Sequence, residues 1–146
     1  MNFDDETVDI LYNEVKEALN AQFESITALN TKLADIMKMS LFTLGVLIIL
    51  DKESIVTTIA LLLLWCAFLI PLFGYMKESY RRDPDPLLLK EKYIMRDAKP
   101  VKVQIMDNVI DSYTENKIKI ELKSKLINPA LLFLMAGVFM ALVDLL

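Results

Sequence analysis

Two basic stretches hold the residues whose types and spacing could bind an anion, because lysine and arginine side chains donate hydrogen bonds to phosphate and carboxylate groups. Two structural alternatives compete with that chemistry. Glu115 and Glu121 stand four residues before lysines, so the second stretch predicts helical ion pairs. Bases beside an apolar segment also mark the cytoplasmic face of a membrane. We favour the structural alternatives for a set that comprises Lys77, Arg81, Arg82, Lys117, Lys119, Lys123 and Lys125.

Other candidates for chemistry are few. The 146-residue chain has no histidine and a single cysteine, Cys66, which we expect to be a buried packing residue. Asp144 is expected to mark the outer membrane interface. The composition excludes a disulfide framework or a Cys/His metal site within one chain. We therefore predict a protein that is not an enzyme and has no cofactor.

The charge balance argues against nucleic-acid binding. The net charge is −4, and the first 35 residues carry eight acids against two bases. Nucleic-acid binding would require a concentration of positive charge.

Three apolar blocks predict an all-α integral membrane protein. They cover residues 36–50, 55–76 and 126–146, in a chain that is 55% hydrophobic. A helix needs roughly 20 residues to cross a bilayer core of about 30 Å. The first block is short and is expected to continue a preceding helix, so that residues 36–76 form a hairpin of spans. Trp65, near the middle of the second span, is expected to pack on another helix, and Ala136, Gly137 and Ala141 offer small surfaces for helix contact.

The distribution of basic residues predicts the orientation of the chain in the membrane. Seven lie in 77–82 and 117–125, whereas the turn at 51–54 has one lysine and two acids. The positive-inside rule therefore predicts a multi-pass protein of the cell membrane with a cytoplasmic N-terminus and an extracytoplasmic C-terminus.

The segments outside the spans predict a cytoplasmic helical bundle. Residues 1–35 are expected to form an acidic amphipathic helix, and 77–125 a second helical segment with a short helix at 86–96 and a long one from about residue 101. Asn128 and Pro129 mark a predicted joint where the long helix enters the third span, since proline removes one helical hydrogen bond. The apolar face of the first helix repeats in steps of three and four, as in coiled coils, and comprises Val8, Leu11, Val15, Leu19, Phe23, Ile26, Leu29 and Leu33. On the long helix, the expected face comprises Val103, Met106, Ile110, Tyr113 and Ile120, with Ile105 and Val109 beside it.

This order of elements resembles a superfamily of small prokaryotic membrane proteins, the SLATT-type and Pycsar-effector-type proteins of nucleotide-signalling antiviral systems. The resemblance is carried by the helix that leads into a hairpin of spans, by Tyr113 and Asn116, and by the lysine-rich run 119–125 that enters a further span. SLATT-type members usually have two spans, so the third span is a departure. The resemblance implies oligomerisation and disturbance of the membrane, with any nucleotide sensor on a separate protein.

Two functional hypotheses follow. The first is a homo-oligomeric membrane protein that forms pores or perturbs the bilayer. The alternative is a membrane-anchored scaffold or accessory subunit whose acidic helix binds a basic cytoplasmic protein. In both, the lipid bilayer is a partner and nucleic acid is not.

Overall fold

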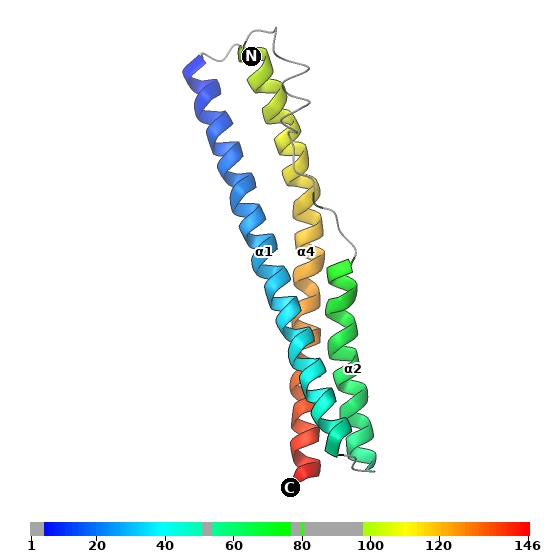
Figure 1. Ribbon diagram of the computed structural model, residues 1–146. Coiled ribbons are helices and arrows are strands. Elements are labelled where there is room, and N and C mark those ends of the chain that lie inside the picture. The colour runs from blue at the N-terminus through cyan, green and yellow to red at the C-terminus, as the bar shows by residue number, and fades with distance from the viewer. Residues whose placement is uncertain (1–4, 51–53, 77–79, 81–97) are drawn as a thin grey trace. The chain divides into compact units, whose positions relative to one another are not determined.

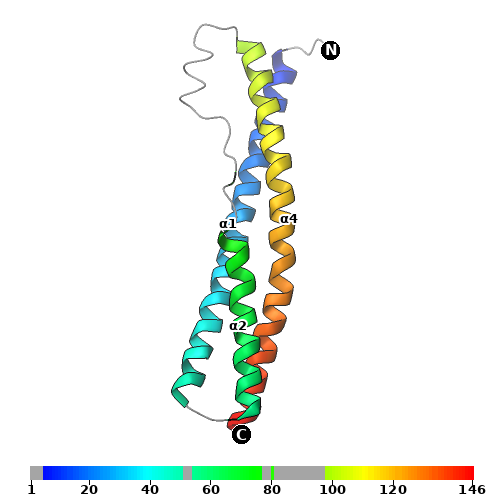
Figure 2. The same cartoon turned by 90° about the vertical axis from the view of Figure 1, so that its right-hand side faces the viewer.

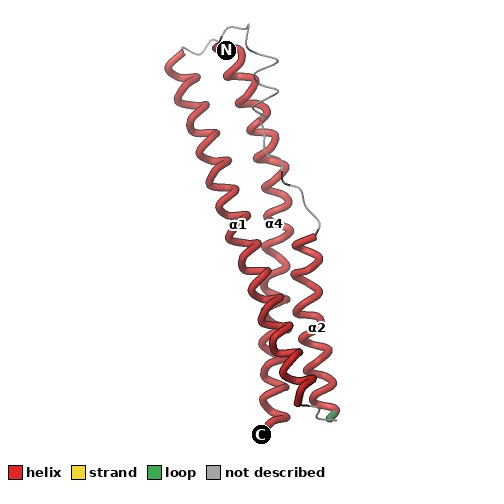
Figure 3. Tube along the Cα trace, in the orientation of Figure 1, coloured by secondary structure: helices red, strands yellow, loops and turns green. Residues whose placement is uncertain are grey.

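The computed structural model describes residues 5–50, 54–76, 80 and 98–146. These residues form three helices, α1 (Asp5–Leu50), α2 (Ile55–Met76) and α4 (Ala98–Leu145), and no strand occurs among them (Figures 1 and 3). Each helix is long and apolar enough to cross a membrane. The predictions of an all-helical chain and of three membrane-length segments are thus confirmed for the described residues.

The helix boundaries follow local sequence. α2 has the predicted bounds, and α1 continues through residues 35 and 36 because no glycine or proline occurs before Gly45. α4 begins at Ala98, slightly before the expected start. Pro100 then lies in its first turn, where proline is tolerated because the missing N–H would have no helical acceptor. The helix predicted at 86–96 and the turn residues 51–53 lie outside the described residues.

The helices pack in two compact units. Unit 1 draws on residues 1–26 and 79–120, and unit 2 on residues 27–78 and 121–146. Each is described by itself below.

In unit 1, the first turns of α1 and α4 run side by side in the same direction (Figure 2). A small apolar core of Leu19, Ile105 and Val109 lies between them. The face expected for α4 is therefore rotated: Ile105 and Val109 are buried, whereas Ile110 is 43% exposed. The buried positions of α4 are spaced by four, three and four residues, and they comprise Ile105, Val109, Ser112 and Asn116.

In unit 2, α2 packs antiparallel to α4, because Thr57 contacts Asp144 while Gly74 lies against Leu126. The buried positions of α2 alternate by three and four residues, and they comprise Thr57, Ala60, Leu64, Ala67, Pro71 and Gly74. Such spacing keeps one side of a helix facing its neighbours. Several of these residues are small, which lets helix backbones approach closely.

Gly137 marks the closest such approach in unit 2. A Cβ atom on Gly137 would lie 2.8 Å from Leu64 Cγ and 3.3 Å from the Leu64 backbone nitrogen. Gly137 and Ala141 are buried, as expected for small contact residues, and Ala136 is half-buried.

Two predictions within α2 are wrong. Trp65 is 48% exposed and makes an edge contact with Phe68 of the same helix, at 6.0 Å between ring centroids. Cys66 is also exposed. Both lie away from the face of α2 that contains Leu64 and Ala67, and small residues occupy that buried face instead.

Candidate functional site

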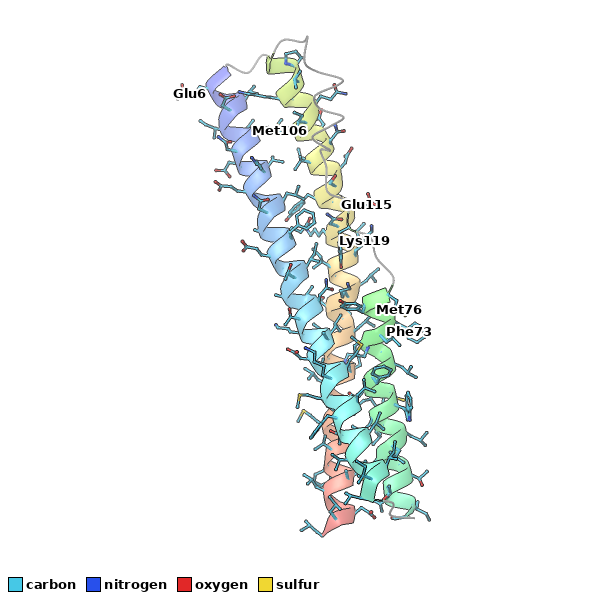
Figure 4. The ribbon with its side chains drawn as sticks, viewed as in Figure 1. Glu6, Phe73, Met76, Met106, Glu115 and Lys119 are labelled. Atoms are coloured by element: carbon cyan, nitrogen blue, oxygen red, sulfur yellow. The ribbon has the colours of Figure 1, made fainter. Side chains whose placement is uncertain are left out.

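The residues of the predicted basic set lie in different environments. Lys77, Arg81 and Arg82 lie outside the described residues. Lys117 is exposed, and Lys119 is half-buried beside Glu115, 3.4 Å from a carboxylate oxygen (Figure 4). Lys125 is exposed and lies 3.3 Å from Glu121. The two predicted i,i+4 pairs are therefore confirmed, and such pairs typically contribute about 0.3–0.5 kcal/mol each.

Lys123 has a different environment. Its residue surface is 3% exposed, and its ammonium group donates a hydrogen bond of 2.9 Å to Asn30 Oδ1. A buried ammonium group loses its hydration, so a fixed acceptor has a large effect on stability. Lys123 is thus an interior residue of unit 2, while Lys125 two residues later faces outward.

The predicted joint lies on a continuous helix. Asn128 and Pro129 are exposed, and α4 extends through both. Ala130, the next residue, is fully buried. The proline ring is thus on the outer side of α4 in unit 2, away from the buried positions.

Unit 1 contains a second set of buried polar side chains. Gln22 Nε2 donates to the Tyr113 carbonyl oxygen at 2.9 Å, and Ser112 donates to the Asn108 carbonyl oxygen at 2.8 Å. Asn116 is fully buried. Of these two hydrogen bonds, the one from Gln22 joins α1 to α4, and a buried polar contact between helices favours one register over others. Near the start of both helices, Lys102 pairs with Asp9.

A groove of about 140 Å³ also lies in unit 1, between α1 and α4. Its walls are mostly apolar and consist of residues where the two helices contact each other. The lining residues are Tyr12, Val15, Lys16, Leu19, Asn20, Ile105, Met106 and Val109.

A polar contact joins the apolar parts of α2 and α4. The Thr57 hydroxyl donates a 2.7 Å hydrogen bond to Asp144 Oδ2. Thr57 is buried and Asp144 half-buried. A charge that approaches the apolar region of a bilayer requires such a partner.

Removing that hydroxyl should weaken unit 2. We expect Thr57→Val to lower the free energy of unfolding by about 0.5–1.5 kcal/mol, because the half-buried carboxylate loses one donor. Thermal unfolding in detergent, followed by circular dichroism, measures the change. Thr58→Val is the matched control, since the Thr58 hydroxyl bonds the Ser54 carbonyl oxygen of the adjacent turn. Equal shifts for the two variants would contradict a role for the Thr57–Asp144 contact.

A second groove, of about 240 Å³, lies in unit 2 between α1 and the end of α2. Asn30 lines it, so the residue that holds Lys123 also borders this groove. The remaining lining residues are Thr27, Thr31, Ala34, Lys38 and Tyr75.

Sequence reasoning missed Asn30, Gln22 and the groove at Tyr75. The usable signal was the step of three and four residues, which places polar residues on the buried faces of α1 and α4. Within the described ranges, no group of three or more acids and cysteines could hold a metal ion. No protein family, curated protein or solved structure matches this chain.

Proposed function

We propose that this chain is a non-enzymatic integral membrane protein that crosses the cell membrane three times and acts as a homo-oligomer. Three membrane-length helices support insertion, and only 22–28% of the most apolar stretch of each is buried inside the chain. Soluble proteins rarely leave so much contiguous apolar surface in water. The positive-inside bias supports a cytoplasmic N-terminus and an extracytoplasmic C-terminus.

The proposal of a homo-oligomer rests on large apolar side chains that remain exposed in unit 1. Unit 1 belongs to the charged part of the chain, which the proposal places in water. Burial of such residues against further copies would remove them from water, at about 25 cal/mol per Å². The exposed residues are Ile10, Leu11, Ile110 and Ile118.

The spacing of buried residues indicates coiled-coil packing of the helices within one protomer, and the proposal extends the same mode of packing to contacts between copies. Steps of three and four residues recur on α1, α2 and α4, which is the period of left-handed coiled coils. Gln22, Ser112 and Asn116 are buried inside the protomer, so they would specify the register of α1 against α4 rather than the number of copies.

The molar mass in mild detergent tests the oligomer. We expect light scattering coupled to size exclusion to give a multiple of the 16.7 kDa protomer mass. Ile110→Glu should shift the population toward monomer, because a carboxylate would be placed in the apolar contact. Gln104→Glu adds the same charge at an exposed polar position on another face of α4 and should leave the mass unchanged. A monomer at high concentration, or equal effects of both variants, would contradict the proposal.

Membrane perturbation is the activity that the resemblance suggests for such an oligomer. Release of a dye from vesicles that contain the purified chain tests it, and Ile110→Glu should reduce the release in proportion to the loss of oligomer. Release that persists in the monomeric variant would separate the activity from assembly.

The scaffold alternative is favoured by one observation, an exposed acidic surface on α1. Apart from Asp9, which pairs with Lys102, the carboxylates of this surface face outward from α1 and suit a basic protein partner. Native purification from membranes discriminates: one different protein in a stoichiometric complex would support the scaffold, and copies of this chain alone would support the oligomer. The acidic residues are Glu6, Asp9, Glu14, Glu17 and Glu24.

A further inference from the structure

We propose that the groove at the end of α2 binds the phosphate of an anionic phospholipid headgroup. This inference goes beyond the proposed oligomer and rests only on the proposed membrane insertion. The groove lies in unit 2, where one face of α1 meets Tyr75 in the last turn of α2. Residues 27, 30, 31, 34 and 38 recur at helical spacing, so α1 presents them together.

The lining of the groove suits an oxyanion. The lining residues include the cationic Lys38 and the hydroxyl-bearing Tyr75, and they include no acid. Lys38 is exposed and pairs with Asp35 at 3.2 Å. An exposed pair of this kind is weak, so a phosphate can compete with Asp35 for the ammonium group.

Asn30 contributes an amide donor to the lining residues. Its Oδ1 accepts from the buried Lys123, so Nδ2 is the atom of this amide that can donate to an anion. The positive charge of Lys123 behind Asn30 raises the local potential. Two lysines and an amide therefore favour negative charge at one wall of the groove.

The residues around the groove favour a lipid, rather than a soluble molecule, as the source of the phosphate. Lys38 is the last charged residue of α1, and the exposed apolar side chains of Met39 and Phe42 follow it. On α2, Phe73 and Met76 are also exposed, and Figure 4 shows them extending outward near the end of the helix. Exposed apolar surface within one turn of Lys38, on the side of the groove toward the apolar block, suits acyl chains below a headgroup. Basic pockets between membrane helices on the cytoplasmic side bind anionic headgroups in this way.

Native mass spectrometry of the full chain in detergent, with added phosphatidylglycerol or phosphatidylcholine, tests the proposal. We expect tighter binding of phosphatidylglycerol, and Lys38→Gln should weaken it by about five-fold, the effect of one lysine at a membrane surface. Lys32→Gln removes the same charge from an exposed position of α1 outside the groove and should leave the affinity unchanged.

A second variant separates the groove from general surface charge. Asn30→Asp keeps an acceptor for Lys123 but replaces the Nδ2 donor with a negative oxygen, so it should remove the preference for phosphatidylglycerol without unfolding the chain. Asn128→Asp adds the same charge at an exposed position of α4 and should retain the preference.

Three results would overturn the inference. One is equal loss of affinity in Lys38→Gln and Lys32→Gln, and another is full binding by Asn30→Asp. The third is displacement of the lipid by inorganic phosphate at equal concentration, which would assign the groove to a soluble ligand. Resistance of the chain to alkaline extraction from membranes reports insertion separately, so failure of the lipid site is distinguishable from failure of the proposed membrane location.

Discussion

Gly137→Ala should lower the free energy of unfolding by about 1–3 kcal/mol, the usual cost of forcing an extra methyl group into a packed interior. The new Cβ would lie 2.8 Å from Leu64 Cγ, inside van der Waals contact. Leu64 cannot move its side chain alone to relieve the clash, because its backbone nitrogen is only 3.3 Å from the same point. α2 and α4 must therefore separate locally. Denaturant or thermal unfolding in detergent measures the loss.

The other glycines of the chain supply graded controls. A Cβ atom added to Gly45 would have no neighbouring atom within 4 Å, so Gly45→Ala should gain about 0.5–1 kcal/mol from helix propensity. At Gly74 the close atom is Leu126 Cδ1 at 2.9 Å, the mobile end of a side chain, so the cost should be smaller than at Gly137. An equal loss at Gly45 and Gly137 would contradict the close approach of α2 and α4.

Asn30→Ala should cost about 1.5–3 kcal/mol, the range for a hydrogen bond to a charged group. The variant removes the acceptor 2.9 Å from the Lys123 ammonium group, which stays buried. Lys123→Met should cost less, because it removes the charge together with its need for an acceptor.

The double variant Asn30→Leu/Lys123→Met completes the test. Replacement of both members of a buried polar contact by apolar residues is often neutral, so we expect stability near that of the original chain. Lys125→Met is the matched control at an exposed position and should change stability by less than about 0.5 kcal/mol. Losses that simply add in the double variant would show that Asn30 and Lys123 are not coupled.

The helices could be predicted because the patterns that indicate a helix lie within the helical segment itself. The 22 apolar residues of α2 specify a span, and the absence of proline or glycine before Gly45 carries α1 through the edge of the apolar block. The start of α4 was less predictable, because proline is compatible with both the end of one helix and the first turn of the next.

The buried faces were harder to predict than the helices. Because α2 is apolar on all sides, its sequence has little periodicity. Large residues such as Trp65 therefore do not indicate which side of the helix is buried. Ala67, Pro71 and Gly74, spaced by four and three residues, were the better guide. On α4, a search for apolar residues favoured Ile110, whereas the buried face passes through the polar Ser112.

A step of three and four residues can place a polar residue on a buried face, but no local pattern gives its partner on another helix. Lys123 and Lys125 are equivalent in composition, and only the packing of α4 against α1 makes one an interior residue. Asn30 became significant through a partner 93 positions away in the chain. The groove at Tyr75 likewise joins segments separated by the whole first hairpin.

In the proposed membrane-inserted oligomer, the exposed Trp65 and Cys66 would serve as two natural probes on α2. The chain has one tryptophan and one cysteine, and they are neighbours on an exposed side of the helix. Brominated acyl chains that quench the indole fluorescence would report how far this point lies from the bilayer centre. A spin label on the natural thiol would report the spacing between copies, without any engineered residue.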